Sequence, residues 1–215
     1  MTPRTACTAI GELLCTQYGG EFIPSEDILD NQGRIHVQKK HSTLTELIQN
    51  GLLKPDDAKG LLKFAAVRNP FDTLVSLYWK QRCKYLPLLE DPNSWVNRIG
   101  PLYAKNMKYA QTHSFNQWVL KKCRRQLLKR LFGVQPSMFC DHTRGVDVVM
   151  RYETIEKDLE KVFEKAGISP KAKIPTVNPT EERKERDYRA CYNRLAVVAV
   201  RLAFSDDFKT YGYQF

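Results

Sequence analysis

The stretch Leu61–Ser76, LLKFAAVRNPFDTLVS, decides the fold. Its first half, Leu61–Val67, is almost wholly apolar, which is typical of a strand buried on both faces of a parallel sheet. Asn69 is a residue type that caps helix N-termini. Pro70 suits the first helical position, because its fixed φ matches a helix and its missing N–H would have no partner there. The stretch therefore predicts a buried strand, a sharp turn and a helix in direct succession.

The segments around this stretch alternate between helical and short apolar patterns. Apolar residues at helical spacing predict helices over 6–18, 43–50, 114–132, 154–166 and 188–204. Pro55 opens a short turn or helix. Short apolar runs predict strands over 34–37, 137–140 and 146–150. Residues 87–113 contain several Pro and Gly and indicate a loop-rich region. Helices that alternate with short strands indicate an α/β fold.

The composition is that of a globular chain. It has 215 residues, of which 42% are hydrophobic and 27% charged, and this excludes a wholly disordered or collagen-like chain. The length suits a single domain over 1–215. No apolar run approaches the ~20 residues needed to cross a bilayer. No secretory signal pattern is visible at the N-terminus, so we expect a cytoplasmic location.

The charge balance favours an anionic partner. The chain carries 34 Lys and Arg against 24 Asp and Glu, a formal net charge of +10. Nucleic acid, anionic lipid, an acidic polysaccharide and a phosphorylated cofactor all match such a field. The densest basic block lies within 121–130. It is either a docking surface for an acidic polymer or a solvated helix face. Its members are Lys121, Lys122, Arg124, Arg125, Lys129 and Arg130.

The six cysteines are far apart and form no C-x-x-C pair. This spacing argues against a zinc site, and a disulfide framework is not expected at this length. We expect reduced thiols that are mostly buried, because free cysteine is among the most buried residue types.

Two segments have the residues of an anion-binding site. A buried strand would deliver Arg68 to its carboxyl end, where ligands bind in open α/β sheets, and a guanidinium can hold a phosphate with two hydrogen bonds. Ser76, on the polar face of the next helix, would add a third hydrogen bond. The alternative is a structural ion pair for Arg68 and a solvated Ser76.

The second segment is the loop 3–9, PRTACTA, which runs into the first helix. Free backbone N–H groups and the helix dipole favour an anion at such a place, and small side chains let it approach the backbone. The alternative is a basic tail with an ordinary threonine cap.

These segments resemble a known family. FAAVRNPFDTLVSLYWK, residues 64–80, closely resembles the 3′-phosphate-binding segment of the carbohydrate-type sulfotransferases that use 3′-phosphoadenosine 5′-phosphosulfate (PAPS). The loop PRTACTA resembles that family's 5′-phosphosulfate loop, and the two occur in the family's order. VDVVMRYETIEKDLEKVFEKAGI at 146–168, PTVNPTEERKERDYRACY at 175–192 and the ending DDFKTYGYQF are similar to family segments as well. The resemblance is thinnest at about 85–130.

The resemblance implies the cofactor-binding residues. The 5′-phosphosulfate would lie against the loop residues Arg4, Thr5, Ala6, Cys7, Thr8 and Ala9. The 3′-phosphate would be held by Arg68 and Ser76, with Arg186 or Arg183 as a supplement. The alternative for these two arginines is a helix cap or a surface ion pair. Arg4 stands where the family has lysine, and would stabilise charge on the transferring group as a catalytic residue. Cys7 and Ala9 replace a glycine and a serine, which implies weakened cofactor binding or a degenerate enzyme.

The resemblance also implies the fold. The family has a P-loop-NTPase-like three-layer fold, in which helices flank a parallel central sheet. In the family an apolar first strand precedes the 5′ loop, whereas Met1 stands immediately before the loop here. Either the start lies upstream, or the sheet lacks its first strand.

The reaction needs a base for the acceptor hydroxyl, and histidine suits this role because its ordinary pKa of about 6.5 is close to neutral pH. His41 lies in KKHSTLTEL, which matches a family segment that precedes the 3′-phosphate segment, and is the candidate base. The alternative for His41 is a surface histidine beside Lys39 and Lys40. His36 is the reserve candidate.

The sequence therefore predicts a metal-independent sulfotransferase that moves a sulfuryl group from PAPS to a hydroxyl, on a saccharide or polysaccharide, and releases 3′-phosphoadenosine 5′-phosphate (PAP). One alternative is a nucleotide-binding pseudoenzyme. A second is a basic nucleic-acid-binding module, although no nucleic-acid motif supports it and no nucleic-acid partner is expected. If residues upstream are missing, a Golgi-lumenal or membrane-associated domain is the alternative location. Trp79 and Trp118 would stack on adenine or sugar, or else belong to the core.

Overall fold

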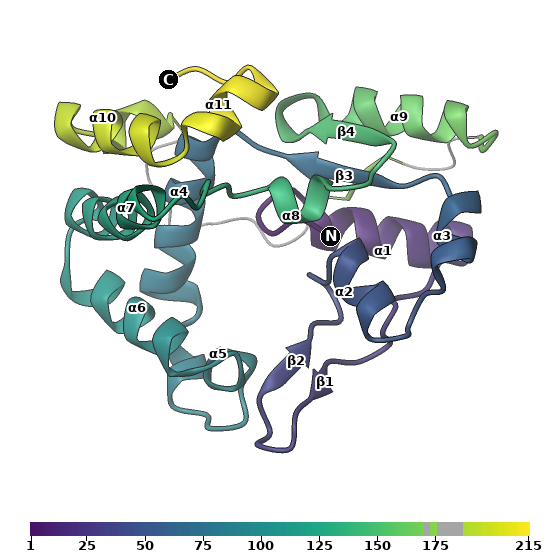
Figure 1. Cartoon of the computed structure of the whole chain (residues 1–215), viewed down its shortest axis with the longest axis horizontal. Helices are drawn as coiled ribbons and strands as arrows, with labels where there is room; N and C mark the ends of the chain where they lie inside the picture. Colours follow the sequence, from purple (N-terminus) through teal and green to yellow (C-terminus); the bar gives the residue numbers. More distant parts are fainter. Residues whose placement is uncertain (170–172, 176–186) are drawn as a thin grey trace. The chain divides into compact units, whose positions relative to one another are not determined.

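The computed structural model describes residues 1–169, 173–175 and 187–215. The chain forms two compact units. The first comprises 1–30, 35–68 and 139–179, and the second comprises 31–34, 69–138 and 180–215. Figure 1 shows the elements of each unit along the chain.

A small parallel sheet forms the centre of the first unit. Strand β3 (Phe64–Val67) pairs with β4 (Val148–Arg151), so that Phe64 lies opposite Val148 and Val67 opposite Arg151. The predicted strand within 61–67 is confirmed, although it begins three residues later, and its last three residues are buried. The strand predicted over 146–150 is confirmed as β4. The chain is therefore an α/β protein with parallel strand pairing.

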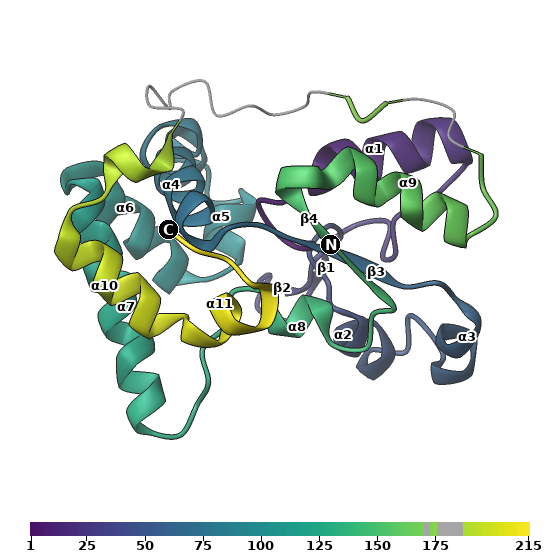
Figure 2. The same cartoon turned by 90° about the horizontal axis from the view of Figure 1, so that it is seen from above.

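Helices lie on both sides of this sheet within the first unit. α1 (Cys7–Tyr18) and α9 (Ile155–Lys165) pack on one side, which confirms two predicted helices. α2 (Leu44–Gln49) and α8 (Cys140–Thr143) lie on the other (Figure 2). The core between the sheet and the α1–α9 layer consists of Ile10, Leu13, Ala66, Met150, Leu159, Val162 and Phe163.

The remaining elements of the first unit are short. The helices predicted at 43–50 and from Pro55 are confirmed as α2 and α3 (Pro55–Gly60). α2 begins at a capping box, in which Thr43 and Glu46 bond reciprocally to each other's backbone N–H groups. β2 (Ile35–Val37) confirms the strand at 34–37, and it pairs antiparallel with the two-residue β1 (Ile28–Leu29).

The strand predicted over 137–140 is wrong. The backbone N–H of Met138 and the hydroxyl of Ser137 donate to the buried carboxylate of Asp207 instead of to a neighbouring strand. Phe139 is fully buried, and the helical turn α8 follows it. The segment is thus buried without pairing to a strand. Periodicity alone does not distinguish such a buried segment from a strand.

The second unit is helical. α4 (Pro70–Trp79), α7 (Phe115–Leu131) and α10 (Arg194–Ala203) enclose its core, which includes Phe71, Leu74, Val75, Trp118, Val119, Ala196 and Val200. The predicted start of α4 is confirmed, because the Asn69 side chain accepts a hydrogen bond of 3.0 Å from the backbone N–H of Phe71. The helix predicted over 114–132 is confirmed as α7, whose cap is Ser114.

Two predictions for the second unit were incomplete. The region 87–113, expected to be loop-rich, contains α5 (Trp95–Arg98) and α6 (Pro101–Thr112), with a 3₁₀ turn at Leu86–Leu89 before them. The helix predicted over 188–204 is interrupted: a 3₁₀ turn covers Tyr188–Cys191, and α10 starts afresh where the Asn193 side chain accepts from the N–H of Ala196. α11 (Ser205–Tyr211) was not predicted.

The cysteines are free thiols, as expected, but they are not mostly buried. Only Cys123, on α7, is buried, and this burial raises the pKa of its thiol to about 12. The other five are partly exposed. Across the described ranges, no helix combines the length and the hydropathy that a membrane crossing requires.

Replacing Phe71 with alanine is expected to destabilise the protein by about 3–5 kcal/mol, because it removes a buried aromatic ring and leaves a cavity. The Phe71 ring is fully buried, with ring centroids of Tyr192, Phe208 and Phe215 at 5.1, 5.2 and 4.7 Å. Urea unfolding followed by circular dichroism measures this loss. Phe71→Leu is the control and should cost less. A loss below about 1 kcal/mol for the alanine variant would contradict this packing.

Candidate cofactor-binding site

Arg68 and Tyr152 meet at the carboxyl ends of the two parallel strands. Each follows its strand directly, and because Val67 lies opposite Arg151 in the register, the next residues are neighbours. The guanidinium of Arg68 lies over the Tyr152 ring at 4.0 Å from its centroid. Arg68 is only 7% exposed. Stacking on an aromatic face holds a buried cation in one orientation. A side chain that binds an anion through directed hydrogen bonds needs such a fixed orientation.

The same guanidinium reaches the loop before α1. Nη1 of Arg68 donates to the backbone carbonyl of Arg4 at 3.1 Å. Arg4 and Ala6 have left-handed backbone conformations, with φ of 69° and 58°. Such conformations are strained for residues with a Cβ atom, and they concentrate at ligand-binding and catalytic sites. The structure therefore brings Arg68 and the loop 3–9 together in the first unit.

The N-terminus of α1 has no side-chain cap. Ala6 occupies the capping position and makes no side-chain bond, so the predicted alternative of an ordinary threonine cap is wrong. The hydroxyl of Thr5 donates instead to the carbonyl of Thr2 at 2.8 Å, within the loop. Cys7, Thr8 and Ala9 follow as the first helical turn. Among the residues that the structure describes, no capping side chain accepts from the first backbone N–H groups of this helix.

One buried hydroxyl in this loop is unsatisfied. Within the described part of the chain, Oγ1 of Thr2 has no hydrogen-bond partner, and Thr2 is 2% exposed. A buried polar atom without a partner is uncommon in a folded protein and commonly marks a ligand or water position.

His41 lies against the same loop. Its Nδ1 is 2.9 Å from the carbonyl oxygen of Met1. A carbonyl only accepts, so Nδ1 carries the hydrogen and Nε2 is left with its lone pair. Burial lowers the pKa of His41 below its usual 6.5, and the charges of the Met1 amino group, Lys40 and Arg4 lower it further, although the bond to Met1 opposes them. A neutral ring with a free Nε2 is the form that accepts a proton.

The reserve histidine has a different setting. Nε2 of His36 is 2.8 Å from Oδ1 of Asn50, the residue that follows α2, on an exposed surface. His142, on α8, belongs to the same unit as His41. Burial lowers the pKa of His142 to about 4, with the charges of the Met1 amino group and His41 acting in the same direction.

The other predicted cofactor residues are not tested by this geometry. Ser76 lies on α4 in the second unit and is 2% exposed, so the solvated alternative is wrong, and its phosphate contact stays a prediction. Arg186, like Arg183, falls outside the described residues. Trp118 is buried in the core of the second unit and Trp79 packs beside it, which supports the core interpretation of both.

Part of the basic block is already engaged. Nζ of Lys121 lies 3.4 Å from the ring centroid of Tyr109, and Nζ of Lys122 lies 5.5 Å from that of Trp118. Arg130 pairs with Asp206 at 3.0 Å. Arg124, Arg125 and Lys129 are exposed.

Tyr152 is a candidate site residue that the sequence analysis did not identify. Its turn is held by Asp158, whose Oδ2 accepts from the backbone N–H of Arg151 and from the hydroxyl of Thr154, both at 2.9 Å. The available signal was positional: Tyr152 follows the predicted strand over 146–150 as Arg68 follows the strand within 61–67. The pairing of these strands was not foreseen, so the two side chains were not connected.

Comparison with known proteins places the chain in a family. A model of the sulfotransferase family matches residues 1–214. Carbohydrate sulfotransferase 10 of Rattus norvegicus is 25% identical over 231 aligned positions, and that of Mus musculus is 26% identical. In both cases the match covers 99% of this chain and 63% of the relative, so the chain spans less than two thirds of their length. No solved structure gives a significant match. The chain therefore belongs to the sulfotransferase family and is similar to its carbohydrate-type members.

Proposed function

We propose that this protein transfers a sulfuryl group from PAPS to a hydroxyl of a saccharide. One observation carries the proposal: Arg68, the strained loop before α1 and His41 converge in one unit. The family as a whole supports sulfuryl transfer, and the names of the curated relatives support a carbohydrate acceptor. We further propose that the sheet belongs to a three-layer fold of the P-loop type.

The residues present fit a nucleotide with phosphates at both ends. The uncapped first turn of α1, the side chain of Arg4 and the unsatisfied Thr2 hydroxyl are donors for a 5′-phosphosulfate. Arg68 is a donor for a 3′-phosphate at the carboxyl end of β3. PAPS would supply the sulfuryl group on a phosphosulfate anhydride, whose cleavage releases PAP.

The chain's own residues then have distinct roles. Nε2 of His41 accepts the proton of the acceptor hydroxyl as the new oxygen–sulfur bond forms. The first turn of α1 and Arg4 stabilise the negative charge that grows on the departing phosphate oxygen as the anhydride bond breaks. Arg4 does this as a fixed cation, since its pKa above about 12 keeps it protonated. Arg68 orients the nucleotide and, through the Arg4 carbonyl, the loop itself.

A transfer assay with radiolabelled PAPS tests the proposal. The full chain is incubated with oligosaccharides that end in different sugars, and sulfated product is separated from PAPS. We expect label on at least one saccharide and an equal amount of PAP. Binding of PAP without transfer to any acceptor would favour the nucleotide-binding pseudoenzyme, to which the Cys7 and Ala9 departures point. Failure of PAP to bind would overturn the proposal.

Replacing Tyr152 with leucine is expected to weaken PAP binding about three- to tenfold, the range expected when a largely buried arginine no longer stacks on an aromatic ring. Tyr152→Phe keeps the aromatic face and should bind PAP as the wild type does. Isothermal titration of both variants measures the difference. Equal affinities for the leucine and phenylalanine variants would show that the stacking does not position Arg68.

A further inference from the structure

The surface of α7 and α10 has an unusual charge pattern. The two helices pack against each other in the second unit. Neither contains an Asp or Glu, while α7 contains six Lys or Arg and α10 contains two. A solvated helix face normally mixes both signs. The charged side chains of these two helices are therefore all positive, and of them Arg130 pairs with Asp206 of α11.

The outer face of α10 is apolar. Its inner face contributes Ala196, Val200 and Ala203 to the core. Leu195, Val198 and Leu202 follow one another at spacings of three and four residues, which places them on one side of the helix, and they are 64%, 54% and 56% exposed. A helix that is apolar on both faces is expected to be covered on both faces.

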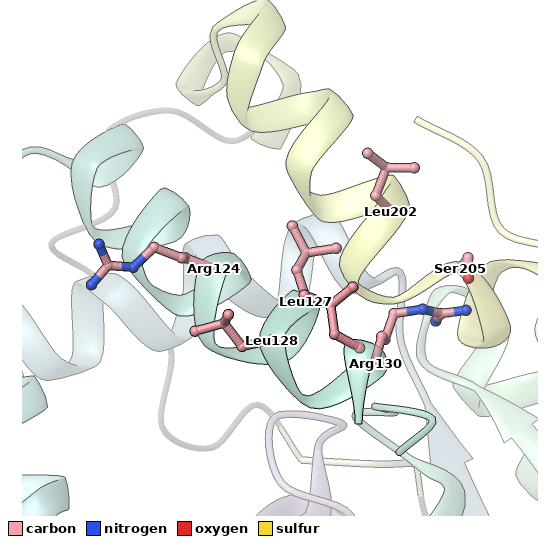
Figure 3. Close-up of a pocket in the computed structure, with 7 residues that line it drawn as sticks. Arg124, Leu127, Leu128, Arg130, Leu202 and Ser205 are labelled. Atoms are coloured by element: carbon pink, nitrogen blue, oxygen red, sulfur yellow. The ribbon is translucent and has the colours of Figure 1, made fainter. Parts of the chain in front are cut away.

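This stripe continues onto α7. Leu202 lines an open groove of about 380 Å³ together with Leu127, Leu128 and Leu131. Figure 3 shows Leu127 and Leu128 between the side chains of Arg124 and Arg130 on α7, and Leu202 on the neighbouring helix α10. At the end of α7, Leu131 and the next residue Phe132 are 80% and 85% exposed. The result is one apolar surface bordered by cations.

We propose that this surface docks on an anionic lipid bilayer. Exposed Arg124, Arg125 and Lys129 would contact the headgroups, and Leu131 and Phe132 would enter the acyl boundary beside them. A second copy of the chain is disfavoured because two such surfaces repel each other. A single acidic helix in the groove would leave Phe132 and the far end of α10 uncovered. The inference is independent of the proposed sulfuryl transfer.

Vesicle co-sedimentation of the full chain tests the docking. We expect binding to vesicles of phosphatidylcholine with phosphatidylserine, and much less to phosphatidylcholine alone. The double variant Leu131→Ser and Phe132→Ser should lose about tenfold or more of this binding. Both side chains are exposed, so the fold should persist, which a circular dichroism melt checks. Leu61→Ser, at an exposed leucine of the first unit, is the control and should bind like the wild type.

Three results would overturn the proposal. The first is absence of wild-type binding to the anionic vesicles. The second is unchanged binding of the double serine variant while Arg124→Glu with Arg125→Glu abolishes it, because attraction would then be purely electrostatic. The third is binding of a synthetic acidic amphipathic peptide, abolished by the double serine variant, with no binding to vesicles, because the surface would then be a helix-docking groove.

Discussion

Replacing His41 with alanine is expected to lower kcat for sulfuryl transfer by about 10²–10⁴-fold, the usual contribution of a positioned general base. The physical reason is that Nδ1 is committed to the Met1 carbonyl, so the proton of the acceptor hydroxyl is taken up at Nε2. Steady-state assays with the best acceptor from the transfer experiment measure the loss. KM for PAPS should change little, because His41 is not proposed to hold the nucleotide.

His36→Ala is the matched control for this variant. His36 is an exposed histidine of the same unit, bonded to Asn50 rather than to the loop, and its removal should leave kcat within about twofold of the wild type. If His36→Ala lost as much activity as His41→Ala, or if His41→Ala were fully active, the assignment of the base would be wrong.

The pH dependence of kcat/KM for the wild type also tests the assignment of His41 as the base. Burial holds the pKa of His41 below 6.5, so the ring is neutral and basic at neutral pH. The rate kcat/KM should therefore stay high as pH falls toward 6.5, and decline only below it, as the ring becomes protonated. In His41→Ala this acidic decline should disappear. A wild-type rate that already falls steeply between pH 8 and 7 would contradict the lowered pKa.

Replacing Arg68 with alanine is expected to weaken PAP binding about 10- to 100-fold. Hydrogen bonds to charged groups contribute about 1.5–3 kcal/mol, and 1.4 kcal/mol corresponds to a factor of ten. The effect has two parts in this chain. The variant loses the partner of the 3′-phosphate, and it also loses the bond that holds the Arg4 carbonyl and hence the 5′ loop. Isothermal titration with PAP measures the combined loss of affinity from both parts.

Two control variants separate charge from geometry. Lys59→Ala removes one positive charge from an exposed position of the same unit and should leave PAP binding unchanged, since a surface charge is largely screened. Arg68→Lys keeps the charge but not the planar fork, and should bind with intermediate affinity. If Arg68→Ala bound PAP with wild-type affinity, the proposed role of Arg68 would be refuted. A comparable loss of affinity in Lys59→Ala would show that Arg68 contributes only through net charge.

The sequence predicts best where local chemistry decides the structure. The strand before Arg68, the Asn69 cap with Pro70 and the helix that ends at Gly19 all follow from short-range rules, and all are present. The predictions fail where tertiary contacts decide. Ser137 and Met138, which were predicted to lie in a strand, donate hydrogen bonds to the Asp207 carboxylate instead. The Asn193 side chain caps the N-terminus of α10, although the apolar pattern predicts one continuous helix over 188–204.

The candidate site was predictable in its residues and less so in its connections. The positions of Arg68 and the loop 3–9 followed from their motifs, and that of His41 from its family segment. That one guanidinium bonds to the loop and stacks on Tyr152 depends on strand register, which no local pattern encodes. The hydrogen bond from the Thr5 hydroxyl to the Thr2 carbonyl, which holds the loop together, was not predicted either.

The relative affinity of the protein for PAP and for adenosine 5′-phosphate tests the central claim most directly. The two nucleotides differ only in the 3′-phosphate, and isothermal titration measures both on the same sample. The arrangement of Arg68 behind the loop predicts that PAP binds at least about tenfold more tightly. Equal affinities, or no binding of PAP at all, would contradict the account.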